Sequence, residues 1–385
     1  SSGAPASPPP VTMSTPSPLP TRDPRVLRVA VNERASALLF LALPQFIRTH
    51  ENDLDVEVIV VPEAALRWQM LSAGRVDLAC GTLDSFVLAA KRNDPGALLF
   101  EIAASKGLDA LVARNAASLR DLKGKAIAVV GGEGGLRLLA YFLDSANMLL
   151  SHVRVVDADD VRDAVQLLRG ERVDAAVLWS PYADAATKEM DVHVIARSSD
   201  TLPQPIDVCV VSHTALANRK SQVLKLMRSW FELERTVISN RLTGIELVSR
   251  YSGHPATEVA DLLASVRLFT LDENQRIDTG TVGTEVGALQ DFWRITDMPN
   301  NDGKVDAEHL VQLDLTRQIE PASASPRVNT SGHPEGHTPS AKFEEMPIEV
   351  DSTVPPSETS SSSASPDLEQ KVTPDAPSDS SPSPH

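Results

Sequence analysis

The sequence predicts an α/β protein whose folded part forms two lobes with a ligand cleft between them. Three features of the 385 residues carry this prediction. Runs rich in β-branched residues alternate with segments that have apolar residues at helical spacing, which is typical of parallel sheets with crossover helices. One strand-and-helix unit of the chain occurs twice, and both ends of the chain are rich in Pro and Ser.

The two ends have the composition of disordered segments. Residues 1–24 form a Pro/Ser-rich stretch, and residues 321–385 hold ten acidic and three basic residues among Ser and Pro runs. Segments with so few aliphatic side chains bury too little apolar surface to offset the entropy lost on ordering. We therefore expect a disordered linker over 1–24, a folded body over 25–320 and a disordered acidic tail over 321–385.

The body contains an internal duplication. QMLSAGRVDLA (69–79) and QLLRGERVDAA (166–176) share a Gln, an apolar pair, Arg-Val-Asp and a closing Ala, 97 residues apart. A β-rich run precedes each copy, at 56–61 and 153–156, so that each unit predicts a strand, a helix and a strand. Two such units predict two α/β lobes.

A further strand-to-helix step precedes each unit, at 27–43 and 125–143. In open parallel sheets a ligand binds beyond the carboxyl ends of the strands, where helix N-termini present free N–H groups. The segments expected at those ends are polar, Gly-rich or aromatic: NERAS (32–36), GTLDS (81–85), GGEGG (131–135) and WSPY (179–182).

Charge and motifs exclude several classes of protein. The net charge is −16 and no stretch is rich in Lys and Arg, so we expect no nucleic-acid partner. No run reaches the ~18 apolar residues that span a bilayer. The Pro/Ser-rich stretch 1–24 would suit a tether that follows a removed export signal. No metal-ligand spacing, Walker motif or nucleophile motif occurs, so we expect neither metal nor cofactor.

Five landmarks occur in a characteristic order: AGRVDLACGT, ASKGLDALVAR, SLRDLKGKAIAV, RGERVDAAVLWSPY and LPQPIDVCVVS. In this order they resemble the substrate-binding proteins of ABC importers for nitrate, taurine, alkanesulfonates and thiamine precursors. The resemblance implies a two-lobed type II periplasmic-binding-protein fold. Residues 25–107 and 203–320 would together form one lobe, and residues 108–202 the other.

The resemblance also implies a function and a location. The chain would be a non-catalytic monomer that binds a small organic solute between its lobes and delivers it to a membrane permease. Its location would be periplasmic or at the cell surface. Two alternatives remain open: an enzyme on the same fold, with Asp84 or Glu133 as the base, and a solute sensor.

Candidate ligand-binding residues follow from the strand ends and from the resemblance. Arg34 or Lys106 would neutralise a carboxylate, sulfonate or phosphate, with solvation at the surface as the alternative for each, and Asp207 would face a positive or hydrogen-bond-donating group. We expect Glu33 to be solvated or to cap a helix, and Asp77 and Asp174 to have structural roles in turns or caps. The full candidate set is Asn32, Arg34, Ser36, Thr82, Asp84, Ser85, Lys106, Gly132, Gly134, Gly135, Trp179, Tyr182 and Asp207.

The two cysteines, Cys80 and Cys209, are too few for a disulfide framework. In the family, the returning segment that would contain Cys209 runs antiparallel beside the strand that would end at Cys80. The resemblance therefore implies that the two sulfurs are neighbours, either as a disulfide or as two buried thiols.

Overall fold

The structure is a computed structural model that describes residues 23, 25–50, 54–130, 132–200, 204–295, 305 and 307–320. All of them fall in the first of two compact units, Ser1–Ser325. The predicted disordered segments 1–24 and 321–385 lie outside the described residues, except for Asp23.

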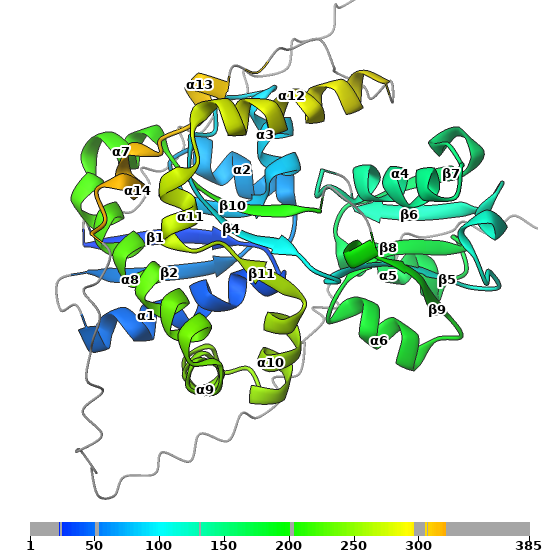
Figure 1. Cartoon of the computed structure of the whole chain (residues 1–385), viewed down its shortest axis with the longest axis horizontal. Coiled ribbons are helices and arrows are strands. Elements are labelled where there is room, and N and C mark those ends of the chain that lie inside the picture. The colour runs from blue at the N-terminus through cyan, green and yellow to red at the C-terminus, as the bar shows by residue number, and fades with distance from the viewer. Residues whose placement is uncertain are drawn as a thin grey trace, which may run out of the picture. The chain divides into compact units, whose positions relative to one another are not determined.

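Two mixed β-sheets organise the described residues (Figure 1). We call the part built on the first sheet lobe 1 and the part built on the second sheet lobe 2. In order across lobe 1, the sheet consists of β11 (Val266–Leu268), β4 (Ala97–Ser105), β10 (Ile206–Val211), β3 (Leu78–Thr82), β1 (Val26–Val31) and β2 (Asp55–Val60). In lobe 2 it consists of β7 (Arg154–Ala158), β6 (Ala126–Val130), β8 (Ala175–Trp179), β5 (Asp109–Ala113) and β9 (His193–Arg197).

The two sheets repeat one plan. In each, three parallel strands are followed by an antiparallel neighbour: β2, β1 and β3 by β10, and β7, β6 and β8 by β5. The duplicated sequence forms α2 (Ala64–Ser72) with β3 and α5 (Val161–Arg169) with β8. The duplication predicted from the sequence is therefore a duplication of strand order as well.

The two duplicated aspartates have equivalent structural roles. Asp77 Oδ2 accepts a hydrogen bond from the backbone N–H of Arg28 in β1 at 2.9 Å. Asp174 Oδ2 accepts one from the backbone N–H of Ala126 in β6 at 2.8 Å. Each carboxylate thus joins the start of one strand to the neighbouring strand, as the prediction of a structural role requires.

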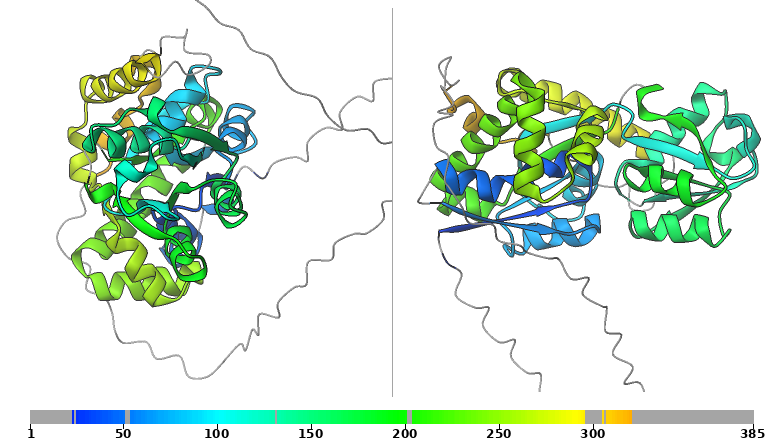
Figure 2. Two further views of the ribbon diagram at one scale, coloured as in Figure 1. Left: turned by 90° about the vertical axis from the view of Figure 1, so that its right-hand side faces the viewer. Right: turned by 90° about the horizontal axis from the view of Figure 1, so that it is seen from below.

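Helices cover both faces of each sheet (Figures 1 and 2). On lobe 2, α4 (Gly135–Ser145) packs on one face, and α5 with α6 (Tyr182–Glu189) packs on the other. On lobe 1, α2, α3 (Leu83–Ala90) and α12 (Thr279–Ile295) share one core. The other core lies under α1 (Leu38–His50), α8 (Lys220–Ser239), α9 (Arg241–Ser252) and α10 (Ala256–Ala264).

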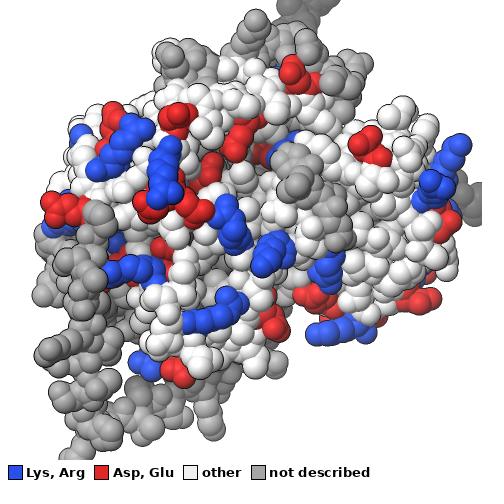
Figure 3. All heavy atoms as spheres, in the orientation of Figure 1, with Lys and Arg blue, Asp and Glu red and all other residues white. Residues whose placement is uncertain are grey.

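Four short helices complete lobe 1: α7 (His213–Asn218), α11 (Leu271–Arg276), α13 (Ala307–Leu310) and α14 (Asp314–Arg317). Among the described residues, no helix has both the length and the apolar character needed to cross a membrane. On the face seen in Figure 3, acidic and basic side chains are interspersed, so this face carries no basic stripe.

The predicted neighbours Cys80 and Cys209 face each other directly. They are register partners in the antiparallel pair of β3 and β10. Both are buried free thiols, and burial is the main cause that raises the pKa of Cys80 well above its ordinary value. Of the two arrangements that the resemblance left open, the structure has the thiol pair.

Candidate functional site

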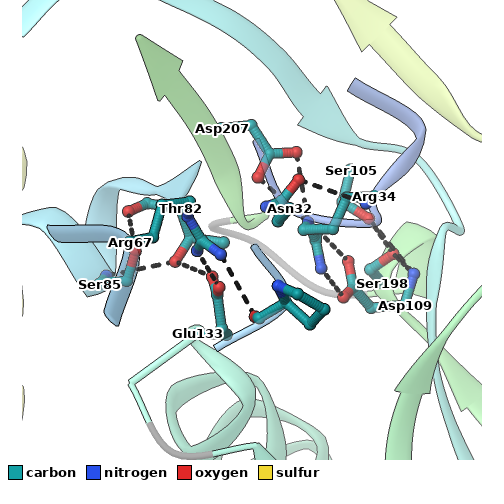
Figure 4. Close-up of polar contacts among 11 residues, drawn as sticks. Asn32, Arg34, Arg67, Thr82, Ser85, Ser105, Asp109, Glu133, Ser198 and Asp207 are labelled. Carbon is teal, nitrogen blue, oxygen red and sulfur yellow. Dashed lines mark hydrogen bonds and ion pairs between the residues drawn. The ribbon is translucent and has the colours of Figure 1, made fainter. Parts of the chain in front are cut away.

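The candidate site lies where strand ends of the two lobes meet. Lobe 1 contributes the residues after β1, the junction of β3 with α3, and the start of β10. Lobe 2 contributes the start of β5, the loop from β6 to α4, and the end of β8. Figure 4 shows polar side chains of lobe 1, among them Arg34 and Arg67, pointing toward Asp109 and Glu133 of lobe 2.

Arg34 is at the centre of the first cluster and its side chain is fully buried. Its Nη1 and Nη2 atoms donate to Asp109 Oδ1 and Oδ2 at 2.7 and 3.0 Å, and its Nε donates to Asp207 Oδ1 at 3.1 Å (Figure 4). Asp109 begins β5 of lobe 2, whereas Asp207 lies in β10 of lobe 1. One guanidinium therefore connects carboxylates from both lobes.

Burial and charge act in opposite directions on this cluster. Burial alone lowers the pKa of Arg34, but the carboxylates of Asp109 and Asp207 raise it above its ordinary value. Burial raises the pKa of Asp207, and Arg34 only partly offsets this effect. The indole ring of Trp179 lies beneath the guanidinium, with its centroid 5.2 Å from Arg34 Cζ.

The second cluster joins Arg67 of α2 to Glu133 of the loop between β6 and α4. Arg67 Nη2 donates to Glu133 Oε1, and Thr82 Oγ1 donates to Glu133 Oε2 at 3.2 Å (Figure 4). Arg67 Nη1 also donates to the backbone oxygen of Val61 at 2.6 Å, which fixes the guanidinium in lobe 1. All three interacting side chains are buried.

The third pair crosses between the lobes beside the glycine loop. Arg137 Nε and Nη2 donate to Asp84 Oδ1 and Oδ2, each at 2.6 Å. Gly134 in this loop has a φ of +78°, in the left-handed region, where any residue with a side chain would strain the backbone.

The rim of the interface carries a weaker set of contacts. Tyr182 Oη donates to Glu33 Oε2 at 2.9 Å, and Arg162 pairs with Glu33 Oε1. Burial, followed by the effect of Glu33, raises the pKa of Tyr182 to about 12. The expectation that Glu33 is solvated is wrong, because its carboxylate accepts hydrogen bonds from two residues of lobe 2.

A cavity of about 170 Å³ lies at this rim, with Asn32, Glu33, Arg34 and Tyr182 in its lining. Within the described part of the chain, two buried donors nearby have no hydrogen-bond partner: Asn32 Nδ2 and Trp179 Nε1. A buried N–H without an acceptor is costly, and a ligand oxygen would remove that cost.

The structure brings most of the predicted residues to one interface. Asn32, Arg34, Ser36, Thr82, Asp84, Ser85, Trp179 and Asp207 are all buried there. Gly132, Gly134 and Gly135 lie in the loop that carries Glu133, and Tyr182 begins α6. Lys106 is exposed and takes part in none of these clusters, because the bend between β4 and β5 turns its side chain to solvent.

Sequence reasoning missed Arg67, Asp109 and Arg137. Each is a charged residue within an otherwise apolar stretch: LRWQML, GLDALVA and GLRLLA. A charged side chain inside an apolar stretch needs a partner of opposite charge when the stretch packs against the rest of the protein. This need is the signal in the sequence that points to the three residues.

Comparisons with known proteins give consistent results. Residues 50–229 match the family described as NMT1/THI5 like. A putative aliphatic sulfonates-binding protein of Escherichia coli (strain K12) is 23% identical over 272 residues, which cover 69% of this chain and 82% of that protein.

Two solved structures are similar in fold. The alkanesulfonate-binding protein of Xanthomonas axonopodis pv. citri, bound to MOPS, has a TM-score of 0.62 at 17% identity, over 76% of this chain and 99% of its own. The ligand-binding component of an ABC-type import system from Staphylococcus aureus, with zinc bound, has a TM-score of 0.63 at 12% identity, over 77% and 99%. The fold predicted from the sequence is confirmed.

Proposed function

We propose that this chain, whose residues 50–229 match the family described as NMT1/THI5 like, is the solute-binding component of an ABC-type importer. It would capture a small organic molecule between its lobes and deliver it to a membrane permease from a periplasmic or cell-surface location. One chain would suffice, because both halves of the candidate site come from the same chain.

The observation that carries this proposal is the set of buried ion pairs between the lobes. Two fully buried guanidinium–carboxylate pairs, Arg34 with Asp109 and Arg67 with Glu133, join lobe 1 to lobe 2, and the part-buried pair of Arg137 with Asp84 lies beside them. Charged groups can be buried only when they are paired, and they regain hydration when they separate. An interface of this kind can open in water at a lower cost than an apolar one, as repeated capture and release require.

The contacts also support a class of ligand. Each of the three arginines is already paired with a carboxylate, whereas the side-chain N–H groups of Asn32 and Trp179 lack acceptors among the described residues. We propose a small molecule with acceptor oxygens that bind these donors as the lobes close. Such oxygens would also take the place of a protein carboxylate as the hydrogen-bond acceptor of one of the arginines. The sulfonates named for the relatives are the first compounds to test.

The decisive experiment is native mass spectrometry of protein purified without denaturation, followed by calorimetric titration with a series of alkanesulfonates and matched carboxylates. We expect one bound molecule per chain and weaker binding by Asn32→Leu, which removes the unpaired donor. Asn218→Leu, an exposed control on α7, should bind normally.

Two results would count against the proposal. Absence of any bound molecule, together with no heat from either series, would remove its basis. Conversion of a bound molecule on incubation would favour the enzyme alternative. The carboxylates of Asp84 and Glu133, its two candidate bases, accept hydrogen bonds from arginines in this structure.

A further inference from the structure

A second cavity, of about 490 Å³, lies in lobe 1 between α8, α11 and the residues after α14. It shares no lining residue with the cavity at the rim of the inter-lobe interface. Its volume is within the ~300–1,000 Å³ of small-molecule sites, whereas the rim cavity of about 170 Å³ is smaller.

The walls of this cavity are preformed. Arg228, Phe231, Arg235 and Ile238 recur at helical spacing along one face of α8 and form one side. On the other side, Gln275 Nε2 of α11 donates to the backbone oxygens of Thr316 and Ile319 at 3.1 and 2.8 Å. These hydrogen bonds hold α14 and the residues that follow it against α11.

Glu234 is the polar group that distinguishes this cavity from an ordinary apolar groove. Glu234 is only 2% exposed and lines the cavity, and its Oε1 atom has no hydrogen-bond partner among the residues that the structure describes. Burial, followed by the effect of Glu273, raises the pKa of Glu234 to about 8, although Arg235 acts in the opposite direction. A ligand that donates to this oxygen would remove the cost of leaving it unpaired.

The charges around the cavity determine the sign of the ligand. Acidic side chains in the lining outnumber basic ones even when Glu234 is protonated: Glu232, Asp272 and Glu320 against Arg228 and Arg235. An anion would be repelled by this set, whereas a cation would be attracted. The buried ring of Phe231 and the exposed side chain of Ile238 offer apolar surface beside the carboxylates.

We propose that this cavity is a second binding site, separate from the inter-lobe interface, for a small organic cation with an apolar body. The cationic group donates to Glu234, and the apolar body packs on Phe231 and Ile238. Ion-pair formation requires the carboxyl group of Glu234 to lose its proton. Binding therefore strengthens as the pH rises toward the pKa of that group.

The test is calorimetric titration of the full chain with hexylamine, which is cationic at neutral pH, and with hexanoate as the matched anion. We expect one hexylammonium per chain and no binding of hexanoate. Affinity should rise by about tenfold from about pH 6 to pH 7, less steeply from pH 7 to pH 8, and level off above that. Glu234→Gln should weaken binding by roughly tenfold or more and abolish the pH dependence, whereas Glu246→Gln, an exposed control on α9, should have no effect.

Several outcomes would overturn the proposal. Equal binding of hexanoate, or an affinity for hexylammonium that does not change with pH in the unmodified protein, would exclude an ion pair with Glu234. Loss of amine binding in Asp207→Asn but not in Glu234→Gln would place the amine in the inter-lobe site instead. The pH profile decides the matter even if Glu234→Gln does not fold.

Discussion

Replacing Arg34 with methionine removes the guanidinium that joins Asp109 of lobe 2 to Asp207 of lobe 1. Methionine keeps much of the apolar bulk, so the main change is electrostatic. Two buried carboxylates then face each other without a cation, at residues that are 4% and 1% exposed. We expect the closed arrangement of the lobes to be destabilised much more than the fold of either lobe.

The size of the effect follows from the burial of the pair. Removing one partner of a buried ion pair costs about 3–5 kcal/mol, because the remaining charge loses its compensation. At about 1.4 kcal/mol per factor of ten, the ratio of closed to open protein falls by roughly two to four orders of magnitude. Opening returns both carboxylates to water, so the loss should appear as separation of the lobes and leave the melting temperature nearly unchanged.

Small-angle X-ray scattering of the unliganded protein measures this change directly. Arg34→Met should increase the radius of gyration, and its affinity for a ligand that requires closure should fall in proportion. The control combines Arg34→Met with Asp109→Asn and Asp207→Asn, which removes the repulsion and should restore much of the compact form. Identical scattering from Arg34→Met and the unmodified protein would refute the assignment of Arg34 as the group that holds the lobes together.

Three further predictions concern buried residues. Trp179→Ala should lower the free energy of unfolding by about 3–5 kcal/mol in a urea titration, because the ring is only 5% exposed and packs in the core. A change below ~1 kcal/mol would show that the ring does not contribute to the core. Burial, followed by the effect of Glu285, raises the pKa of Glu101 to about 8, so the folded protein retains a proton that the unfolded chain releases near pH 4. Stability should therefore decline as the pH rises from about 5 through 8, and Glu101→Gln should flatten this decline in melting experiments; an unchanged slope would contradict the assignment. Cys80 and Cys209 should resist a thiol reagent in the native protein and both react after denaturation without reductant, whereas no reaction after denaturation would indicate a disulfide.

The sequence was sufficient to predict the architecture because the signals for it are local. Alternation of strands and helices and the repeat at 69–79 and 166–176 depend only on neighbouring residues. The structural role of Asp77 and Asp174 was predictable for the same reason, since each precedes the strand that it joins to its neighbour.

The ion pairs of the candidate site were not predictable in this way. Arg67 pairs with Glu133 across 66 residues, and Arg34 pairs with Asp109 across 75. Which carboxylate meets which arginine depends on how the two lobes face each other, and no local pattern encodes that geometry. Lys106, in contrast, is a residue that the sequence suggested for the site and that the structure does not place there. It lies near the crossing between the lobes in sequence, but its side chain is exposed.

The position of β10 in lobe 1 has a consequence for how the chain folds during synthesis. This strand pairs with β3 on one side and with β4 on the other, and it is made only after the whole of lobe 2. Until it emerges, β3 and β4 lack their shared neighbour and leave two hydrogen-bonding edges unpaired. The strands of lobe 2 lie in one continuous segment and pair across fewer than a hundred residues, whereas β3 and β10 of lobe 1 pair across more than a hundred, so we expect lobe 2 to fold first. The interval between the two events is the period in which this protein is most exposed to aggregation through its sheet edges.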